Sequence, residues 1–114
     1  MAELHIEVSK KEEIERFICI VCLGIVEAIQ CNILSAHEIT YFFAAPYSAH
    51  ILEKKYVDKE ILIIINLLCE LEDVERLIPD KFNISLDDTK ERILKFMSSI
   101  SKPQLPQKYW IQKE

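Results

Sequence analysis

The pattern of apolar positions predicts two long helices that are apolar over most of their surface. In the first, from about Lys10 to Cys31, apolar side chains recur every three or four residues. The second begins after Asp58 and ends at Pro79, and it contains the β-branched run 63–65. That run also fits a buried strand, but the length of the segment and its charged flanks favour a helix. We expect these two helices to form the centre of the protein.

Shorter helices are predicted around this centre. The pattern 35–38, "SAHE", is a capping box, and the helix that it opens should stop near Ala45, because the residue before Pro46 avoids helical angles. A further helix can start at Pro46 itself. The last helix runs from about Ser85 to Ile100. The pattern therefore predicts an all-α fold, a compact bundle of four to five helices.

The two ends of the chain have a different pattern. Residues 1–9 form a short extended arm in which apolar and polar positions alternate, and Ser9 is expected to cap the first helix with Glu12 as its partner. Residues 101–114 form an extended tail that contains two prolines and several large apolar side chains, namely Leu105, Tyr109, Trp110 and Ile111. Such side chains favour docking of the tail on its own chain, with contact to a second copy or to a partner as the alternative.

Composition supports a single globular domain. The chain has 114 residues, of which 50% are apolar and 29% are charged, and it contains one glycine, Gly24. A glycine inside the first helix lowers helix stability, so we expect a close approach of a neighbouring helix there. The net charge of −5 disfavours binding to nucleic acid or to an anionic membrane, and it is compatible with a basic protein partner.

The start of the chain, "MAELHIEVSKKEEIE", lacks the pattern of a secretory signal peptide. We therefore expect a cytoplasmic protein with free cysteines. A membrane span is not expected either, because the apolar run from Phe17 to Val26 covers about ten residues before Glu27, half of what a span needs.

The first helix contains a C-x-x-C pattern, Cys19 and Cys22, with Cys31 and Cys69 elsewhere in the chain. Two cysteines on one helix face could hold a metal, but a structural zinc site needs four ligands. A thioredoxin-like redox motif stands at a helix start, not inside an apolar helix. Small core residues are the favoured interpretation, so no metal and no cofactor are expected. Since no catalytic motif is visible, we expect a non-enzymatic protein.

The densest chemical feature is the segment 69–80, "CELEDVERLIPD". It carries five carboxylates, on Glu70, Glu72, Asp73, Glu75 and Asp80. Such a segment can dock a basic partner. It can also be an ordinary solvated helix face in which Glu72 pairs with Arg76 one turn later.

Two polar residues interrupt the central helices, Glu27 in the first and Asn66 in the second. The favoured interpretation is that Glu27 faces the edge of the bundle and that Asn66 is hydrogen-bonded. Alternatively, the two pair across the core, or a pocket between the central helices is lined by Glu27, Tyr41 or Asn66. The pocket is the basis of an alternative function, a small regulatory or ligand-binding protein.

Several stretches together resemble a family of small uncharacterised bacterial proteins, mainly Gram-positive, that share a domain of unknown function. They are "CLGIVEAI", "ILSAHEI", "FFAAPY", "LEKK", "DKEI" and "ELEDVERLIP", and the similarity covers about 14–100. The resemblance implies a compact helical domain and no activity. Some small acidic proteins of such bacteria are immunity proteins against toxins. The favoured hypothesis is therefore a protein-binding module, of which an immunity protein is the narrower form, with a protein partner or a second copy bound through Glu70, Glu72, Asp73, Glu75, Tyr109 and Trp110.

Overall fold

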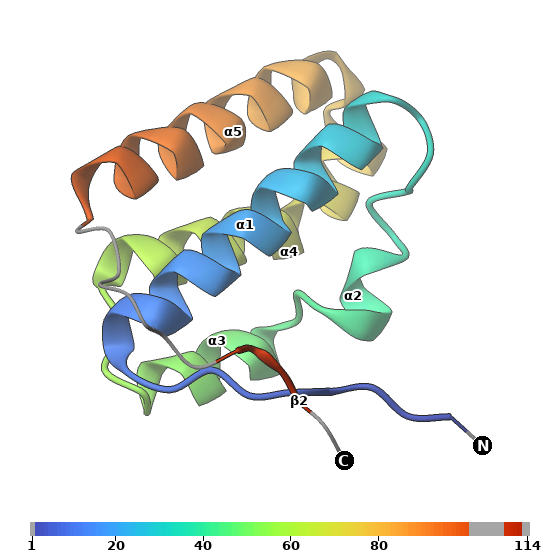
Figure 1. Cartoon of the computed structure of the whole chain (residues 1–114). Coiled ribbons are helices and arrows are strands. Elements are labelled where there is room, and N and C mark those ends of the chain that lie inside the picture. The colour runs from blue at the N-terminus through green and yellow to red at the C-terminus, as the bar shows by residue number, and fades with distance from the viewer. Residues whose placement is uncertain (1, 101–108, 113–114) are drawn as a thin grey trace.

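The structure, a computed structural model, describes residues 2–100 and 109–112. Over these residues the chain is an all-α bundle with one small two-stranded ribbon, as Figure 1 shows. The elements in chain order are β1 (His5–Ile6), α1 (Lys11–Gln30), α2 (Ile39–Phe42), α3 (Pro46–Glu53), α4 (Lys59–Leu77), the 3-10 helix η1 (Pro79–Lys81), α5 (Phe82–Ser99) and β2 (Ile111–Gln112). The predicted fold class is confirmed.

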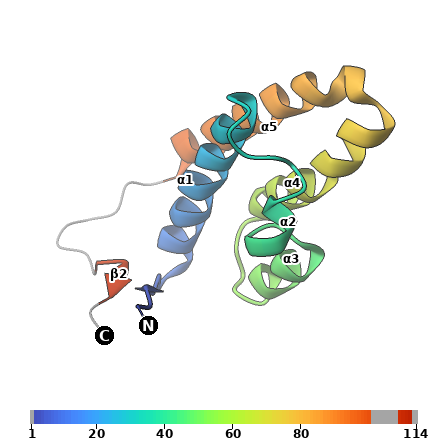
Figure 2. The same cartoon turned by 90° about the vertical axis from the view of Figure 1, so that its right-hand side faces the viewer.

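Helices α1 and α4 form the centre of the bundle, as the apolar pattern predicted. Helix α5 packs against both of them, and α3 packs against α4 on the other side (Figures 1 and 2). The buried apolar side chains of these three long helices are Ile18, Cys19, Cys22, Ile25, Val26 and Ile29 of α1, Ile61, Ile64, Ile65, Leu68 and Leu71 of α4, and Leu86, Ile93 and Phe96 of α5. The run 63–65 is helical, so the strand alternative does not hold.

Two of the predicted helix caps are present. The side chain of Asp58 accepts a hydrogen bond from the backbone N–H of Glu60 at 2.9 Å, which caps α4. The capping box before α2 is also formed, with Ser35 N donating to Glu38 Oε2 at 2.8 Å and Glu38 N donating to Ser35 Oγ at 3.2 Å. These hydrogen bonds hold the pKa of Glu38 below its ordinary value, with the backbone N–H of Ser35 as the largest cause.

Two predicted helix starts are wrong. The residue before α1 is Lys10, which has a φ of 71°, and no side chain caps this helix, so the expected Ser9 cap does not form. Helix α5 begins at Phe82, not at Ser85. Pro79 opens the 3-10 turn η1, in which Lys81 N donates to Ile78 O at 2.9 Å, and this turn leads directly into α5.

The segment between α1 and α4 is less helical than expected. Helix α2 has only one turn, Ile39–Phe42, although a helix to Ala45 was predicted. The break before Pro46 is confirmed, since Ala45 is extended and α3 begins at the proline. Ser48 stabilises the break: its Oγ donates to Phe43 O at 2.6 Å and accepts from Ala45 N at 3.3 Å.

Gly24 does not mark a close helix contact. A Cβ atom placed on it would have no neighbouring heavy atom within 4 Å, and the residue is exposed. The expectation of a close approach is therefore wrong. The exposed face of α1 continues one turn before it at Ile20, whose exposed fraction is 46%.

The arm and the end of the tail meet in an antiparallel ribbon. Strands β1 and β2 pair with His5 opposite Gln112 and Ile6 opposite Ile111, and Glu7 N donates to Trp110 O at 2.9 Å. The ring of Trp110 packs edge-on against Phe17 of α1, with 5.4 Å between the ring centres. Docking of the tail on its own chain is thus confirmed at this end, whereas the prediction for Leu105 falls on 101–108, outside the described residues.

The contact between Trp110 and Phe17 gives a fluorescence prediction, because Trp110 is the only tryptophan. We expect a blue-shifted emission that does not change on dilution, since the ring packs on Phe17 of the same chain. Phe17→Ala should shift the emission towards that of free tryptophan, whereas Phe42→Ala, a change at an exposed ring on α2, should not. A red shift of the unmodified protein on dilution would show that the contact is made between two copies.

Candidate functional site

The C-x-x-C pattern belongs to the core. Cys19 and Cys22 are fully buried in the face of α1 that packs in the bundle, and all four cysteines have free thiols. Burial raises the pKa of Cys19 to about 11 and raises the pKa of Cys22 further, so both stay protonated at neutral pH. A protonated, enclosed thiol is a poor nucleophile and a poor metal ligand, which confirms the interpretation as small core residues.

The acidic segment, defined as residues 70–80, covers the C-terminal half of α4 and the turn after it. Glu70 and Glu75 are exposed. Asp73 forms an ion pair with Arg76 at 3.0 Å between Oδ1 and Nη2. The predicted pairing of Glu72 with Arg76 is therefore wrong, and the reason is a partner from a distant part of the chain.

That partner is His37, in the capping box before α2. Its Nδ1 forms a short contact with Oε2 of Glu72. On the other side of the ring, Nε2 lies 3.1 Å from the hydroxyl of Tyr41, and the two rings meet edge-on with their centres 5.0 Å apart. A continuous chain of hydrogen bonds, Glu72 to His37 to Tyr41, thus joins the acidic segment to the short helix α2.

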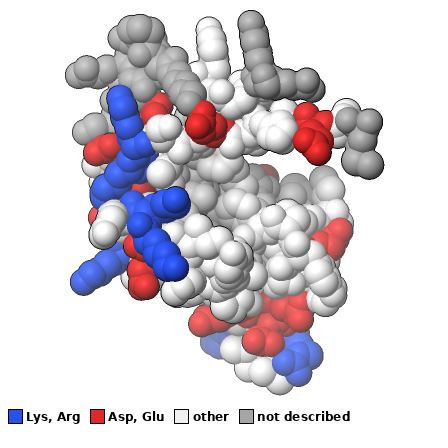
Figure 3. Space-filling model, turned by 90° about the horizontal axis from the view of Figure 1, so that it is seen from below, with Lys and Arg blue, Asp and Glu red and all other residues white. Residues whose placement is uncertain are grey.

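Helices α2 and α3 present large aromatic side chains to solvent. We define the aromatic face as Tyr41, Phe42 and Tyr47, whose exposed fractions are 77%, 61% and 70%. Figure 3 views the molecule from below, the side on which α2 and α3 lie in Figure 1, and the centre of this view is largely uncharged. Basic side chains gather on one flank, and a separate group of acidic side chains, with basic ones beside it, lies at the lower edge.

Glu75 has a further environment, since it lines a pocket of about 260 Å³ beside the end of α1. Ile29, Leu34 and Phe82 supply apolar walls, and Glu38 is a second carboxylate in the lining. The pocket contains no basic side chain among the residues that line it. It thus combines an apolar interior with two negative charges.

With this geometry established, the chain was compared with known proteins. The model of one family, described as a protein of unknown function (DUF3969), matches residues 9–112. The chain belongs to this family. The match extends beyond the resemblance region 14–100 at both ends, and it includes the residues of β2 that close the ribbon with the arm. Comparison with curated proteins and with solved structures gave no match.

The remaining predicted site residues lie apart from the acidic segment. Tyr109 is 87% exposed and Trp110 packs on α1, so this aromatic pair lies beside the ribbon that joins the arm and the tail. Of the two polar residues in the central helices, Glu27 forms an ion pair with Lys90 of α5 at 2.9 Å. Asn66 is exposed on α4. Because Glu27, Asn66 and Tyr41 are all exposed, the structure gives no support to a pocket that they would line between α1 and α4.

Sequence reasoning missed three contributors to the site, His37, Phe42 and Tyr47. Two signals were available. His37 and Tyr41 are four residues apart, the spacing that brings side chains together on one helical turn. The capping box also fixes His37 at the start of α2. The contact with Glu72 spans 35 residues of sequence, and no local pattern predicts it.

No helix within 2–100 is long and apolar enough to cross a membrane. Within the described residues, no group of three or more histidine, cysteine or acidic side chains is arranged to hold a metal ion.

Proposed function

We propose that this protein is a non-enzymatic, cytoplasmic protein-binding module that docks a basic partner on the acidic segment and the adjoining aromatic face. The observation that carries the proposal is the chain of contacts from Glu72 through His37 to Tyr41, because it places carboxylates and exposed aromatic rings on one continuous surface. Exposed rings rimmed by charge are typical of protein interfaces.

The two halves of this surface have different roles. Aromatic side chains provide most of the binding free energy at interfaces, because they bury a large area and lose little conformational entropy. Tyr41, Phe42 and Tyr47 are therefore the expected anchors. Carboxylates such as Glu70 and Asp73 act at longer range, since they attract a basic partner and raise the association rate.

The pocket beside Glu75 adds support for a basic partner. Lysine and arginine have long apolar stems and a charged end. The apolar walls at Ile29, Leu34 and Phe82 suit such a stem, while Glu38 and Glu75 suit its charged group. One basic side chain of the partner is thus expected to enter this pocket.

The narrower proposal is an immunity protein, for which the partner is a toxin. It rests on size, acidity and the absence of any catalytic motif in the sequence. A pull-down from the native host identifies the partner, and a stoichiometric toxin supports this form. A second copy of the chain as the recovered species would instead make the surface a homodimer contact.

Neutralising the acidic segment gives the quantitative test. The triple variant Glu72→Gln, Asp73→Asn, Glu75→Gln should keep the fold, because all three side chains are at least partly exposed. Against the identified partner, its association rate at low salt should fall by about tenfold and lose most of its salt dependence. Surface plasmon resonance at increasing salt concentrations measures both quantities.

The matched control changes the net charge by the same amount elsewhere. Glu12→Gln, Asp88→Asn and Glu91→Gln remove three carboxylates that are exposed on α1 and α5. In this control variant the association rate at low salt should stay close to that of the unmodified protein, with most of its salt dependence. If both triple variants lower the association rate equally, only the overall charge matters and the acidic segment is an ordinary solvated face.

A further inference from the structure

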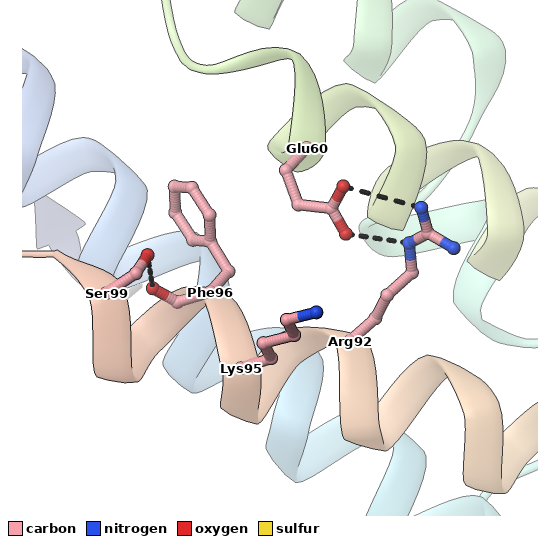
Figure 4. Close-up of a pocket in the computed structure, with 5 residues that line it drawn as sticks. All are labelled: Glu60, Arg92, Lys95, Phe96 and Ser99. Atoms are coloured by element: carbon pink, nitrogen blue, oxygen red, sulfur yellow. Dashed lines mark hydrogen bonds and ion pairs between the residues drawn. The ribbon is translucent and has the colours of Figure 1, made fainter.

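We infer that a pocket between α4 and α5 binds a small organic anion that carries a flat apolar group, such as an aromatic carboxylate. This inference is independent of the proposed function, because it concerns a different part of the surface. The pocket is lined by Glu60 of α4 and by Arg92, Lys95, Phe96 and Ser99 of α5 (Figure 4). Its volume of about 400 Å³ is in the range of small-molecule sites.

The guanidinium of Arg92 is held in a fixed position in this pocket. Its Nε donates to Glu60 Oε2 at 2.7 Å and its Nη2 donates to Oε1 at 3.5 Å, so one carboxylate contacts two nitrogens. This ion pair joins the first turn of α4 to α5, and the remaining nitrogen of Arg92 points away from Glu60, Lys95 and Phe96 (Figure 4). Arg92 therefore supplies a positive charge at the wall of the pocket that Glu60 largely compensates, and Glu60 and Arg92 together fix the shape of this wall.

Lys95 provides a second positive charge, and it is available. It forms no ion pair with any residue in the described part of the chain. Figure 4 shows its ammonium group extending into the space between Phe96 and Arg92. The lining therefore carries two cations and one carboxylate, an excess of positive charge in a protein with a net charge of −5.

The remaining lining is suited to a flat apolar group. Phe96 lines the pocket, although only 9% of its surface is exposed. Ser99 Oγ donates to the carbonyl of Phe96 at 2.7 Å, so its proton is not free to bind a ligand. Phenyl rings stack on one another at low entropic cost, which favours an aromatic group at this position.

The neighbouring charges limit the ligand to a small anion. Asp88 and Glu91 line an adjoining hollow on α5 together with Arg92 and Lys95. Their carboxylates repel an extended polyanion that reaches past Lys95. A monocarboxylate that stays within the first pocket keeps the attraction of Lys95 and avoids this repulsion.

The experiment uses benzoate as the probe and backbone NMR of the full chain as the readout. We expect saturable shifts at Glu60, Lys95 and Phe96 with a dissociation constant on the order of 1 mM, as suits a ligand of this size. Lys95→Gln should weaken binding by about fivefold to tenfold, because it removes the cation of the lining that no carboxylate compensates. Lys81→Gln removes an exposed lysine before the far end of α5, and it should leave the dissociation constant unchanged.

A second variant separates a binding role from a structural one. Glu60→Gln should tighten benzoate binding several-fold, because the charge of Arg92 is then no longer compensated. A purely structural Glu60–Arg92 pair predicts the opposite, since loosening the pocket would weaken binding. Shifts that do not saturate, equal affinities of the Lys95→Gln and Lys81→Gln variants, or weaker binding by Glu60→Gln would each overturn the inference.

Discussion

Replacing Ile65 by aspartate is expected to unfold the protein at room temperature. Ile65 lies in the middle of α4 with no exposed surface, within the apolar core of the bundle. An aspartate there is buried without a partner, so we expect a loss of at least about 4 kcal/mol in the free energy of unfolding. That loss is comparable to the whole stability of many domains of this size. Circular dichroism and urea titration measure the change.

The control for this prediction lies two residues away. Ile63 is 39% exposed, so Ile63→Asp should change the free energy of unfolding much less than Ile65→Asp. The same comparison is available on α1, where Ile25 has an exposed fraction of 6% and Ile20 one of 46%. If Ile65→Asp or Ile25→Asp melted like its exposed control, the assignment of α1 and α4 as the centre would be wrong.

The long helices could be predicted because their signals are redundant. In α1 and α4 many apolar side chains repeat at helical spacing, and the loss of one signal changes little. Helix α4 also has a strong local start signal at Asp58. The predicted end at Pro79 holds to within two residues, since α4 ends at Leu77. The fold class could therefore be predicted from the sequence of each helical segment alone.

Helix starts that depend on a single residue were less predictable. Serine often caps the start of a helix, but neither Ser9 nor Ser85 does so in this protein. Lys10 takes a left-handed conformation that ends the arm, and Pro79 starts a 3-10 turn that makes an earlier start of α5 possible. These outcomes are decided by packing of the arm and of the turn, which local sequence does not contain.

The candidate site was predicted only in part, for a similar reason. The acidic residues of α4 are visible in the sequence, but their partners are not. Glu72 contacts His37 and not Arg76, and Glu60 contacts Arg92, which is 32 residues away. Both contacts follow from how the helices are placed. The exposed aromatic face also depends on α2 being a single turn, whereas a longer helix was predicted.

The most consequential long-range contact is made by Glu15, which is buried in α1 with an exposed fraction of 1%. Its Oε2 accepts a hydrogen bond from the backbone N–H of Asp58 at 2.6 Å and lies 3.0 Å from Nζ of Lys11. It thus joins the start of α1 to the residue that caps α4. Its negative charge also lies near the positive end of the α4 dipole.

Removing this carboxylate is expected to destabilise the protein strongly. In Glu15→Ala the N–H of Asp58 loses its acceptor, and a cavity replaces the buried side chain. We expect a loss of about 2–3 kcal/mol in the free energy of unfolding and a decrease in melting temperature on the order of 10 °C. Glu15→Gln keeps an acceptor of the same size, so it should lose about half as much.

Two further variants identify the cause of the loss. Lys11→Ala removes the exposed partner of the ion pair, and Glu12→Ala changes an exposed carboxylate one turn earlier, so both should cost less than about 1 kcal/mol. Hydrogen exchange at the amide of Asp58 should accelerate in Glu15→Ala and stay slow in Lys11→Ala, because only the first variant removes its acceptor. Equal stability of Glu15→Ala and Lys11→Ala, with unchanged exchange at Asp58, would mean that α1 and α4 are held together by their apolar faces alone.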